Sequence, residues 1–188
     1  MLPLENVKVV SIEQAVAAPL ASRQLADFGA RVIKIERPGT GDFARGYDET
    51  VRGISSWFVW LNRSKQSLTL DLKHSEAKSI LSKLLAGGDV LLHNLGPGAA
   101  ERLGLAGPAL VSQYPQLIVC EISGYGSSGP YQNKKAYDLL IQNETGLVSV
   151  TGTPDAPAKA GISAADIAAG MYAFSGILLA LRRREQTG

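Results

Sequence analysis

Short apolar runs alternate with helical patterns along the first part of the chain. Residues 7–12 and 31–36 predict two buried strands. Between them, the stretch from about Leu20 to Phe28 predicts a helix that ends at Gly29. A polar loop over residues 41–45 follows before apolar sequence returns. This is the beginning of a strand–helix–strand unit.

The alternation continues through the rest of the chain. Ser75 is expected to cap a helix that Gly87 and Gly88 stop. Its core face is expected to carry Ile80, Leu81, Leu84 and Leu85. Further strands are expected at residues 67–71, 89–92 and 117–122, and further helices near residues 138–145 and 163–184.

Short apolar strands that alternate with helices are typical of α/β proteins. The pattern therefore predicts a Rossmann-like parallel sheet with flanking helices. A length of 188 residues suits one well-packed domain rather than two. The sequence shows no internal repeat and no low-complexity segment.

Composition narrows the class of protein. The chain is 45% hydrophobic and 19% charged, as ordinary globular proteins are. A net charge of +2 without a basic run argues against nucleic-acid binding. The single Cys120 lies in an apolar stretch and is expected to be a buried strand residue. His74 and His93 have no metal-ligand spacing around them, so we expect no metal.

One segment has the length of a membrane span. Residues 162–181 are mostly apolar, but they include Asp166, two glycines and many alanines, so we expect a buried core helix and no membrane partner. The amino terminus leads directly into a strand, and we expect no signal peptide. We therefore expect a cytoplasmic enzyme, or in a eukaryote an enzyme of the mitochondrial matrix or the peroxisome.

A dinucleotide site is a first chemical candidate, because Glu36 ends the second strand. A Rossmann NAD site needs glycines in the first turn, where the backbone touches pyrophosphate. That turn, residues 13–19, contains none. The G-x-G at Gly96 and Gly98 follows a later strand and lacks the third glycine. The sequence therefore disfavours NAD.

Basic residues follow several of the expected strands. Arg37, Lys73 and Arg102 each lie soon after one. Because parallel strands end at one edge of the sheet, these side chains could converge there on phosphates. The alternative is that each is a solvated surface charge.

Asp166 also has two interpretations. Ser163 and Asp166 match a capping box at the start of a helix. A carboxylate beside a helix amino terminus is also expected to be held ionised by the helix dipole and the free amides, which suits a nucleophile. The two roles are compatible.

Several stretches together resemble the class III (CaiB/BaiF) CoA-transferase family. They span the whole chain, in the family's order and spacing. They comprise residues 29–38, Gly41-Asp42, 62–65 with 70–73, 94–98 with 102–104, 124–126 with Gly129-Pro130, Tyr137-Asp138 and 161–170.

The resemblance implies a fold and an assembly. The family has a large Rossmann-like domain and a small domain, and its two subunits interlock. Residues 1–188 would be the N-terminal part of the large CoA-binding domain, without the small domain and the C-terminal segment. The full-length protein would be an interlocked homodimer, and the fragment alone would be inactive.

The resemblance also implies site residues. Asp166 matches the family's nucleophile. Arg37, Lys73 and Arg102 would serve the CoA phosphates. The full set of positions matching CoA contacts is Arg37, Leu70, Asp71, Leu72, Lys73, Asn94, Leu95, Gly96, Arg102, Lys135, Ala136, Tyr137 and Asp138. Val16 stands where some oxalate-handling members have a glutamine near the substrate, which argues against oxalate or formate specificity.

The implied activity moves CoA from an acyl-CoA to a carboxylic acid through an aspartyl anhydride and an aspartyl-CoA thioester. CoA is then a substrate, and no tightly bound cofactor is expected. Two alternatives remain. A 2-methylacyl-CoA racemase would use a histidine where this chain has Tyr137, and a phenol is a poor base near neutral pH. A non-catalytic CoA-binding fragment would bind CoA without turnover.

Overall fold

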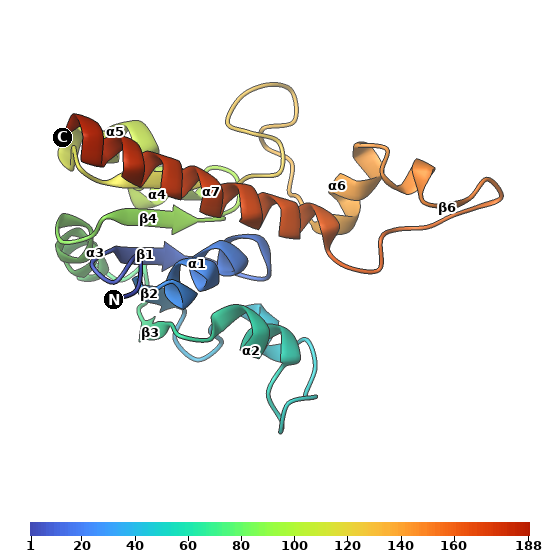
Figure 1. Ribbon diagram of the computed structural model, residues 1–188, viewed down its shortest axis with the longest axis horizontal. Helices are drawn as coiled ribbons and strands as arrows, with labels where there is room; N and C mark the ends of the chain where they lie inside the picture. The colour runs from blue at the N-terminus through green and yellow to red at the C-terminus, as the bar shows by residue number, and fades with distance from the viewer.

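The computed structural model covers all 188 residues and contains one parallel sheet (Figure 1). Its strand order is β3-β2-β1-β4-β5. The strands are β1 (Lys8–Ile12), β2 (Arg31–Glu36), β3 (Gln66–Thr69), β4 (Val90–His93) and β5 (Ile118–Glu121). The helices are α1 (Ala17–Asp27), α2 (Ser56–Asn62), α3 (Ala77–Ala86), α4 (Ala99–Leu103), α5 (Gly107–Gln113), α6 (Asp138–Glu144) and α7 (Ala164–Thr187), with 3-10 turns η1 (Phe43–Gly46) and η2 (Val148–Val150) and a hairpin of β6 (Gly152–Thr153) and β7 (Ala156–Pro157).

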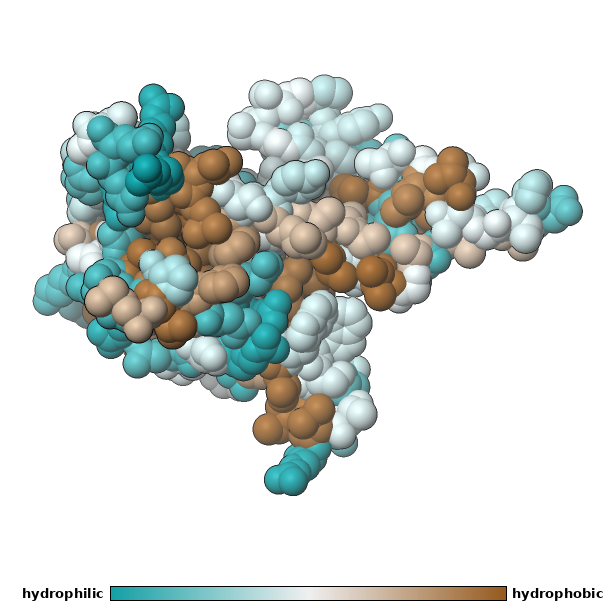
Figure 2. All heavy atoms as spheres, viewed as in Figure 1, coloured by the Kyte–Doolittle hydropathy of each residue, from teal (hydrophilic) through white to brown (hydrophobic).

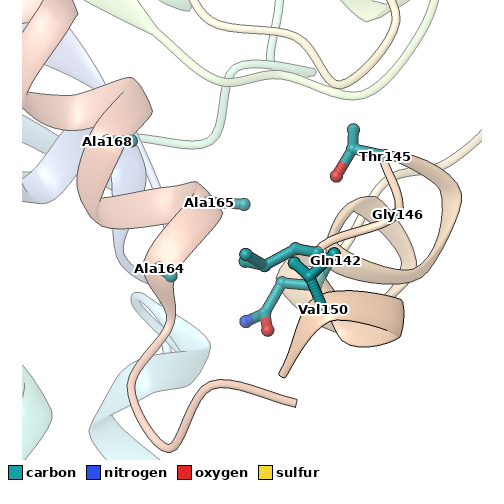
Figure 3. Close-up of a pocket in the computed structure, with 8 residues that line it drawn as sticks. Gln142, Thr145, Gly146, Val150, Ala164, Ala165 and Ala168 are labelled. Atoms are coloured by element: carbon teal, nitrogen blue, oxygen red, sulfur yellow. The ribbon is translucent and has the colours of Figure 1, made fainter. Parts of the chain in front are cut away.

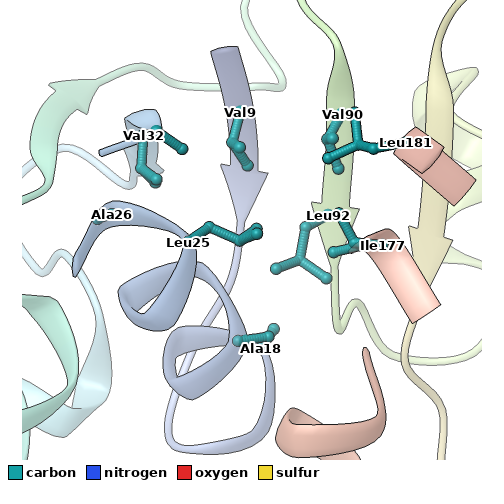
Figure 4. Close-up of a cluster of buried hydrophobic side chains, with 11 residues drawn as sticks. Val9, Ala18, Leu25, Ala26, Val32, Val90, Leu92, Ile177 and Leu181 are labelled. Atoms are coloured by element: carbon teal, nitrogen blue, oxygen red, sulfur yellow. The ribbon is translucent and has the colours of Figure 1, made fainter. Parts of the chain in front are cut away.

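One face of the sheet is covered by α1 and α7. Val9, Val90 and Leu92 point from the strands toward Leu25 of α1 and Ile177 of α7 (Figure 4). These side chains are at most 1% exposed. Burying an aliphatic side chain of this size stabilises the fold by about 1.5–3 kcal/mol. This layer fixes where α7 begins relative to the sheet.

The opposite face is covered by α3 and the α4–α5 segment. Val10 and Leu91, next to the residues that face α1, point here and pack near Leu81 and Leu85 of α3 and Leu110 of α5. Both faces of the central strands are therefore buried, which explains why their sequences are continuously apolar. The predicted α/β fold with a parallel, Rossmann-like sheet is confirmed.

Two helix starts differ from the prediction. Helix α1 begins at Ala17 rather than near Leu20, because Pro19 is compatible with a first helical turn. Helix α3 begins after Glu76, and Ser75 does not cap it. Its buried face is centred on Leu81 and Leu85, and Ile80, one residue from that centre, is 41% exposed.

Helix α7 is less buried than predicted. Only Gly170, Ile177 and Leu181 are buried in this helix. Of its most apolar 18-residue stretch, 17% is buried inside the protein. By length and composition alone this helix could cross a membrane. The expectation of a buried core helix was wrong for most of its length, because one face packs on α1 and the sheet while no segment of these 188 residues covers the other.

Candidate functional site

Strands β1 and β4 are parallel neighbours, so their carboxyl ends lie side by side. The order of the strands reverses between them: β2 and β3 lie on one side, and β5 lies on the other. After β1 the chain passes into α1 on one face, and after β4 it passes into α4 on the other, which makes this edge the usual ligand crevice of an open α/β sheet. The Asn94 side chain bridges the gap: its Oδ1 accepts from the Gln14 amide at 3.0 Å and its Nδ2 donates to the Gln14 carbonyl at 2.8 Å. Asn94 thus joins the two loops of the crevice.

A buried ionic network lies behind the loop that follows β1. Lys34 Nζ donates to Asp42 Oδ2 at 2.6 Å and to Asn62 Oδ1 at 2.8 Å. Lys65 Nζ donates to Glu13 Oε1 at 2.7 Å and to the same Asn62 oxygen at 3.0 Å. Both lysine side chains are at most 2% exposed. Two lysines and two carboxylates thereby tie β1, β2 and the end of α2 together.

The network shifts the titration of its members. Burial alone would raise the pKa of Glu13, but Lys65 and Lys34 hold it below its ordinary value. Burial lowers the pKa of Lys65 to about 8, and the charge of Glu13 opposes that shift. Asp42 Oδ1 also accepts from the amide of Ala15, whose φ of 64° is unusual for a residue with a side chain. The network therefore holds a strained turn in place.

Glu36, at the end of β2, is engaged within the protein. Its carboxylate accepts two bonds from Arg45 and one each from Ser67 and the Asp42 amide. Burial opposes ionisation, but these donors lower its pKa to about 2. Because both oxygens of Glu36 already accept hydrogen bonds from the protein, they are not available to accept one from the ribose of NAD.

Asp166 lies in the first turn of α7 and is half-buried. Burial raises the pKa of its carboxyl group to about 6, and the nearby carboxylate of Asp138 adds to the shift. The sequence expectation that the helix start holds this group ionised was therefore wrong in direction. The Asp138 carboxylate occupies the amides of Ala165 and Asp166, at 2.9 and 3.3 Å. The capping box was wrong too, since the Ser163 side chain makes no cap hydrogen bond.

Aromatic side chains gather beside Asp166, and the sequence analysis missed them as site residues. Tyr47 stacks edge-on against Trp57 and Trp57 against Trp60, with ring centroids 6.3 and 5.6 Å apart. Ile167 and both tryptophans pack against the same small core of Val16, Leu20 and Leu61. Partial burial raises the pKa of Tyr47, as do the charges of Asp42 and Asp166. The tryptophans were visible as apolar sequence after a loop, but only the fold brings them to α7.

The predicted phosphate ligands lie on the expected edge. Arg37 follows β2, Lys73 follows β3 and Arg102 lies in α4 after β4. All three are exposed, and none makes a side-chain hydrogen bond or ion pair with the protein. Arg37 also lines a polar cavity of about 240 Å³ with Gly39, Thr69 and neighbouring residues. Free cations on one edge are suited to binding an anionic ligand.

The remaining predicted CoA contacts fall into two groups. Leu70, Leu72 and Leu95 are half-buried against the second core face, while Asp71 accepts from the Lys73 amide at 2.9 Å. The second group comprises exposed Gly96, Lys135 and Tyr137, half-buried Ala136, and Asp138 at the start of α6. The leucines and Gly96 follow β3 and β4 at the carboxyl edge of the sheet, whereas residues 135–138 lead into α6, where Asp138 contacts the start of α7.

An apolar cavity of about 480 Å³ separates α6 and η2 from α7 (Figure 3). Ala164, Ala165 and Ala168 line it from α7, opposite Gln142 and Val150. The small side chains noted in the sequence leave this space. The cavity lies on the α6 side of the helix, whereas Asp166 is adjacent to Tyr47.

Two further groups bear on reactivity. Cys120 on β5 is half-buried, and burial raises the pKa of its thiol to about 11, so it is a poor nucleophile. His93 is buried with Nε2 3.5 Å from Glu121 Oε1, and burial lowers its pKa. No group of three or more His, Cys, Asp or Glu side chains is placed to hold a metal ion.

The sequence of this site matches a known family. The profile of CoA-transferase family III matches residues 4–188. The chain belongs to this family. Human succinyl-CoA:glutarate CoA-transferase is 35% identical over 188 residues, which cover 99% of this chain and 43% of that protein. The formyl-CoA:oxalate CoA-transferase of Rhodopseudomonas palustris (strain HaA2) is 37% identical, with 98% and 44% covered.

Solved structures agree with the family assignment. A CAIB/BAIF family protein from Brucella suis superposes with a TM-score of 0.93 at 36% identity and covers all of this chain and 51% of that one. A hypothetical protein from Mycobacterium tuberculosis gives 0.91 at 35% identity, with 99% and 52% covered. The CoA-transferase family III chain therefore spans about half the length of these relatives.

Proposed function

We propose that this chain forms the N-terminal part of the large domain of a CoA-transferase, which moves CoA from an acyl-CoA to a carboxylic acid. The observation that carries the proposal is Asp166: a half-buried carboxyl with a pKa of about 6, in a chain that also presents three unpaired cations after its strands. Such a group is mostly ionised at pH 7, yet it is more basic than a free aspartate. Those are the properties of a carboxylate nucleophile.

The proposed reaction has four steps. An Asp166 oxygen attacks the thioester carbonyl of the donor, the C–S bond breaks, and a mixed anhydride and CoA thiolate form. The thiolate attacks the aspartyl carbonyl, so the donor acid leaves as a carboxylate and an Asp166–CoA thioester remains. The acceptor carboxylate attacks this thioester and expels the thiolate, giving a second anhydride. Attack of the thiolate on the acceptor carbonyl releases the new acyl-CoA and restores Asp166.

The other site residues would have separate roles in this reaction. Arg37, Lys73 and Arg102 would hold the CoA phosphates, far enough from the chemistry to leave Asp166 without a cationic partner. The aromatic cluster of Tyr47, Trp57 and Trp60 would exclude water from intermediates that hydrolyse readily. Succinyl-CoA and acetyl-CoA, named for relatives, are the donors to try first. Formyl-CoA, also named for a relative, tests the expectation from Val16 that formate is not a substrate.

The test is covalent trapping in the full-length enzyme. Incubation with each acyl-CoA and no acceptor, followed by peptide mass spectrometry, should add the mass of CoA to the peptide containing Asp166. Asp166→Asn should abolish the adduct and leave CoA binding unchanged. An adduct on another residue would refute the role of Asp166. Deuterium uptake at the α-carbon of a 2-methylacyl-CoA without CoA transfer would identify a racemase, and CoA binding without either reaction would identify a binding module.

We also propose the family's assembly for the whole protein. In this arrangement a small domain and a C-terminal segment complete the large domain, and two copies interlock. The exposed apolar face of α7 supports this, because it offers a surface for such segments. Sedimentation of the full-length protein as a dimer that resists dilution would agree with it, and a stable full-length monomer would contradict it.

A further inference from the structure

The amino terminus of α7 is capped by a residue from another helix. Asp138 Oδ1 accepts from the Ala165 amide at 2.9 Å and from the Asp166 amide at 3.3 Å. The first amides of a helix have no partner within it, so an external carboxylate satisfies them. The cap comes from 27 positions earlier in the chain.

A second residue of α6 fixes that carboxylate. Gln142 is fully buried, and its Nε2 donates to Asp138 Oδ2 at 2.6 Å. Its Oε1 accepts from the Ala160 amide at 2.9 Å, and Nε2 also lies 3.4 Å from the Ile162 carbonyl. Both oxygens of Asp138 are thus engaged, and the segment leading into α7 is tied to α6.

These contacts conflict with a ligand role for the Asp138 side chain. Both of its oxygens already accept hydrogen bonds from the protein, and its negative charge would repel CoA phosphates. The same contacts place it directly against the backbone of Asp166. We infer that Asp138 is a positioning residue that fixes the main chain of the nucleophile and keeps a negative charge beside it, and that its carboxylate does not bind CoA. This inference rests on the proposed role of Asp166.

The electrostatics of the site agree with this geometry. Asp138 at the start of α6 is the charged neighbour that raises the pKa of Asp166. Burial raises the pKa of Tyr47 after η1, and Asp42, Asp166 and Tyr137 add to that shift. The other residues packed there, Ile167 and the tryptophans, carry no charge. After burial, Asp138 is the group that raises the pKa of Asp166. A cation at this position would instead stabilise the ionised carboxylate and make it a weaker base.

Two variants separate charge from geometry in the full-length enzyme. Asp138→Asn keeps an oxygen for the Ala165 amide and removes the charge, although its amide nitrogen loses the Gln142 bond. Gln142→Ala keeps the negative charge of Asp138 and removes the hydrogen bond that holds its carboxylate in place. The midpoint of Asp166 titration is measured by 13C NMR of protein labelled at the aspartate carboxyl carbon, with Asp166→Asn to assign the signal. CoA affinity is measured by equilibrium binding.

Asp138→Asn should move the midpoint from about 6 toward the ordinary aspartate value of about 3.9, stopping short of it because burial remains. Its CoA affinity should stay within about twofold of wild type. Gln142→Ala should leave the Asp166 midpoint and the CoA affinity nearly unchanged. It should slow CoA-adduct formation on Asp166 by roughly 10- to 100-fold, as expected for a misplaced reacting group.

An unmoved midpoint in Asp138→Asn, or a loss of CoA affinity of about tenfold or more, would overturn the inference. Neither measurement needs turnover. If Asp166→Asn still forms the CoA adduct, the proposed function fails, while the titration and the binding still decide the role of Asp138.

Discussion

At the scale of single residues, burial and one neighbouring charge set the chemistry of Asp166. Its pKa of about 6 lies above that of a free aspartate, so its proton leaves in a pH range where most carboxylates are already ionised. Nucleophilic attack needs the ionised form. We therefore expect the rate of CoA-adduct formation to rise with pH through about 6 and to level off above 7.

This pH dependence can be followed by single-turnover mass spectrometry between pH 4.5 and 8. Below the midpoint the rate should fall about tenfold per pH unit, because only the ionised fraction reacts. Circular dichroism at each pH checks that the enzyme stays folded. A rate that is flat over this range, or that falls as pH rises, is incompatible with Asp166 as the titrating nucleophile.

The exposed cations after the strands give a second residue-scale prediction. Changing Arg37, Lys73 or Arg102 to alanine should each weaken CoA binding by about 1–3 kcal/mol, roughly 5- to 150-fold. A pantetheine thioester, which lacks the nucleotide, should lose far less. Arg31 begins the strand that Arg37 follows, at the opposite edge of the sheet, so Arg31→Ala is the matched control. Equal losses for CoA and the pantetheine thioester would exclude a phosphate role.

At the scale of elements, the close approach of α1 and α7 places Asp166 at the edge of the sheet. Gly170 makes this possible: a Cβ there would lie 2.6 Å from the Ala17 carbonyl and 3.0 Å from Leu20 Cβ. In the same helix, a Cβ on the exposed Gly176 would meet nothing within 4 Å. The two glycines form a matched pair within one helix.

Gly170→Ala should destabilise the enzyme by about 1–3 kcal/mol, because the side chain forces the helices apart. Gly176→Ala should stabilise it by up to about 1 kcal/mol, because alanine favours helix without a clash. Urea unfolding of both variants measures the difference. If both substitutions stabilise, the helices do not rely on this close approach.

At the scale of the whole molecule, the main feature is the exposed apolar outer face of α7. Met171, Tyr172 and Leu179 are 56%, 79% and 72% exposed. Apolar atoms are visible along this helix in Figure 2. Leu139 and Leu140 of the neighbouring α6 are also exposed, by 47% and 45%. Patches of this kind mark surfaces that another protein segment covers.

The 188-residue chain expressed alone should therefore self-associate, and Tyr172→Lys with Leu179→Lys should reduce the association. Light scattering after size exclusion measures the mass of each form. Changing the exposed Ser175 of the same helix to lysine serves as the control, because it adds charge without removing apolar surface. A monodisperse monomer of the unmodified chain would show that this face needs no partner.

The sequence by itself determined the α/β fold, the position of each strand of the parallel sheet to within two residues, and the placement of cations after the strands. Those features follow from local periodicity: strands buried on both faces must be apolar throughout, and their ends must be polar. It did not reveal α2, α4 and α5, which have five to seven residues each. Length alone does not explain these omissions, because α6 has seven residues and was predicted.

The tertiary structure alone decided the environment of Asp166. Its helix is capped by Asp138, its aromatic neighbours come from the segment around α2, and the ionic network joins Lys34 to Lys65 across two strands and a helix. A lysine inside an otherwise buried strand was the one local signal of that network. The direction of the pKa shift of Asp166 depends on burial and on a charge 28 positions away, and neither quantity is a property of the residues next to it in the sequence.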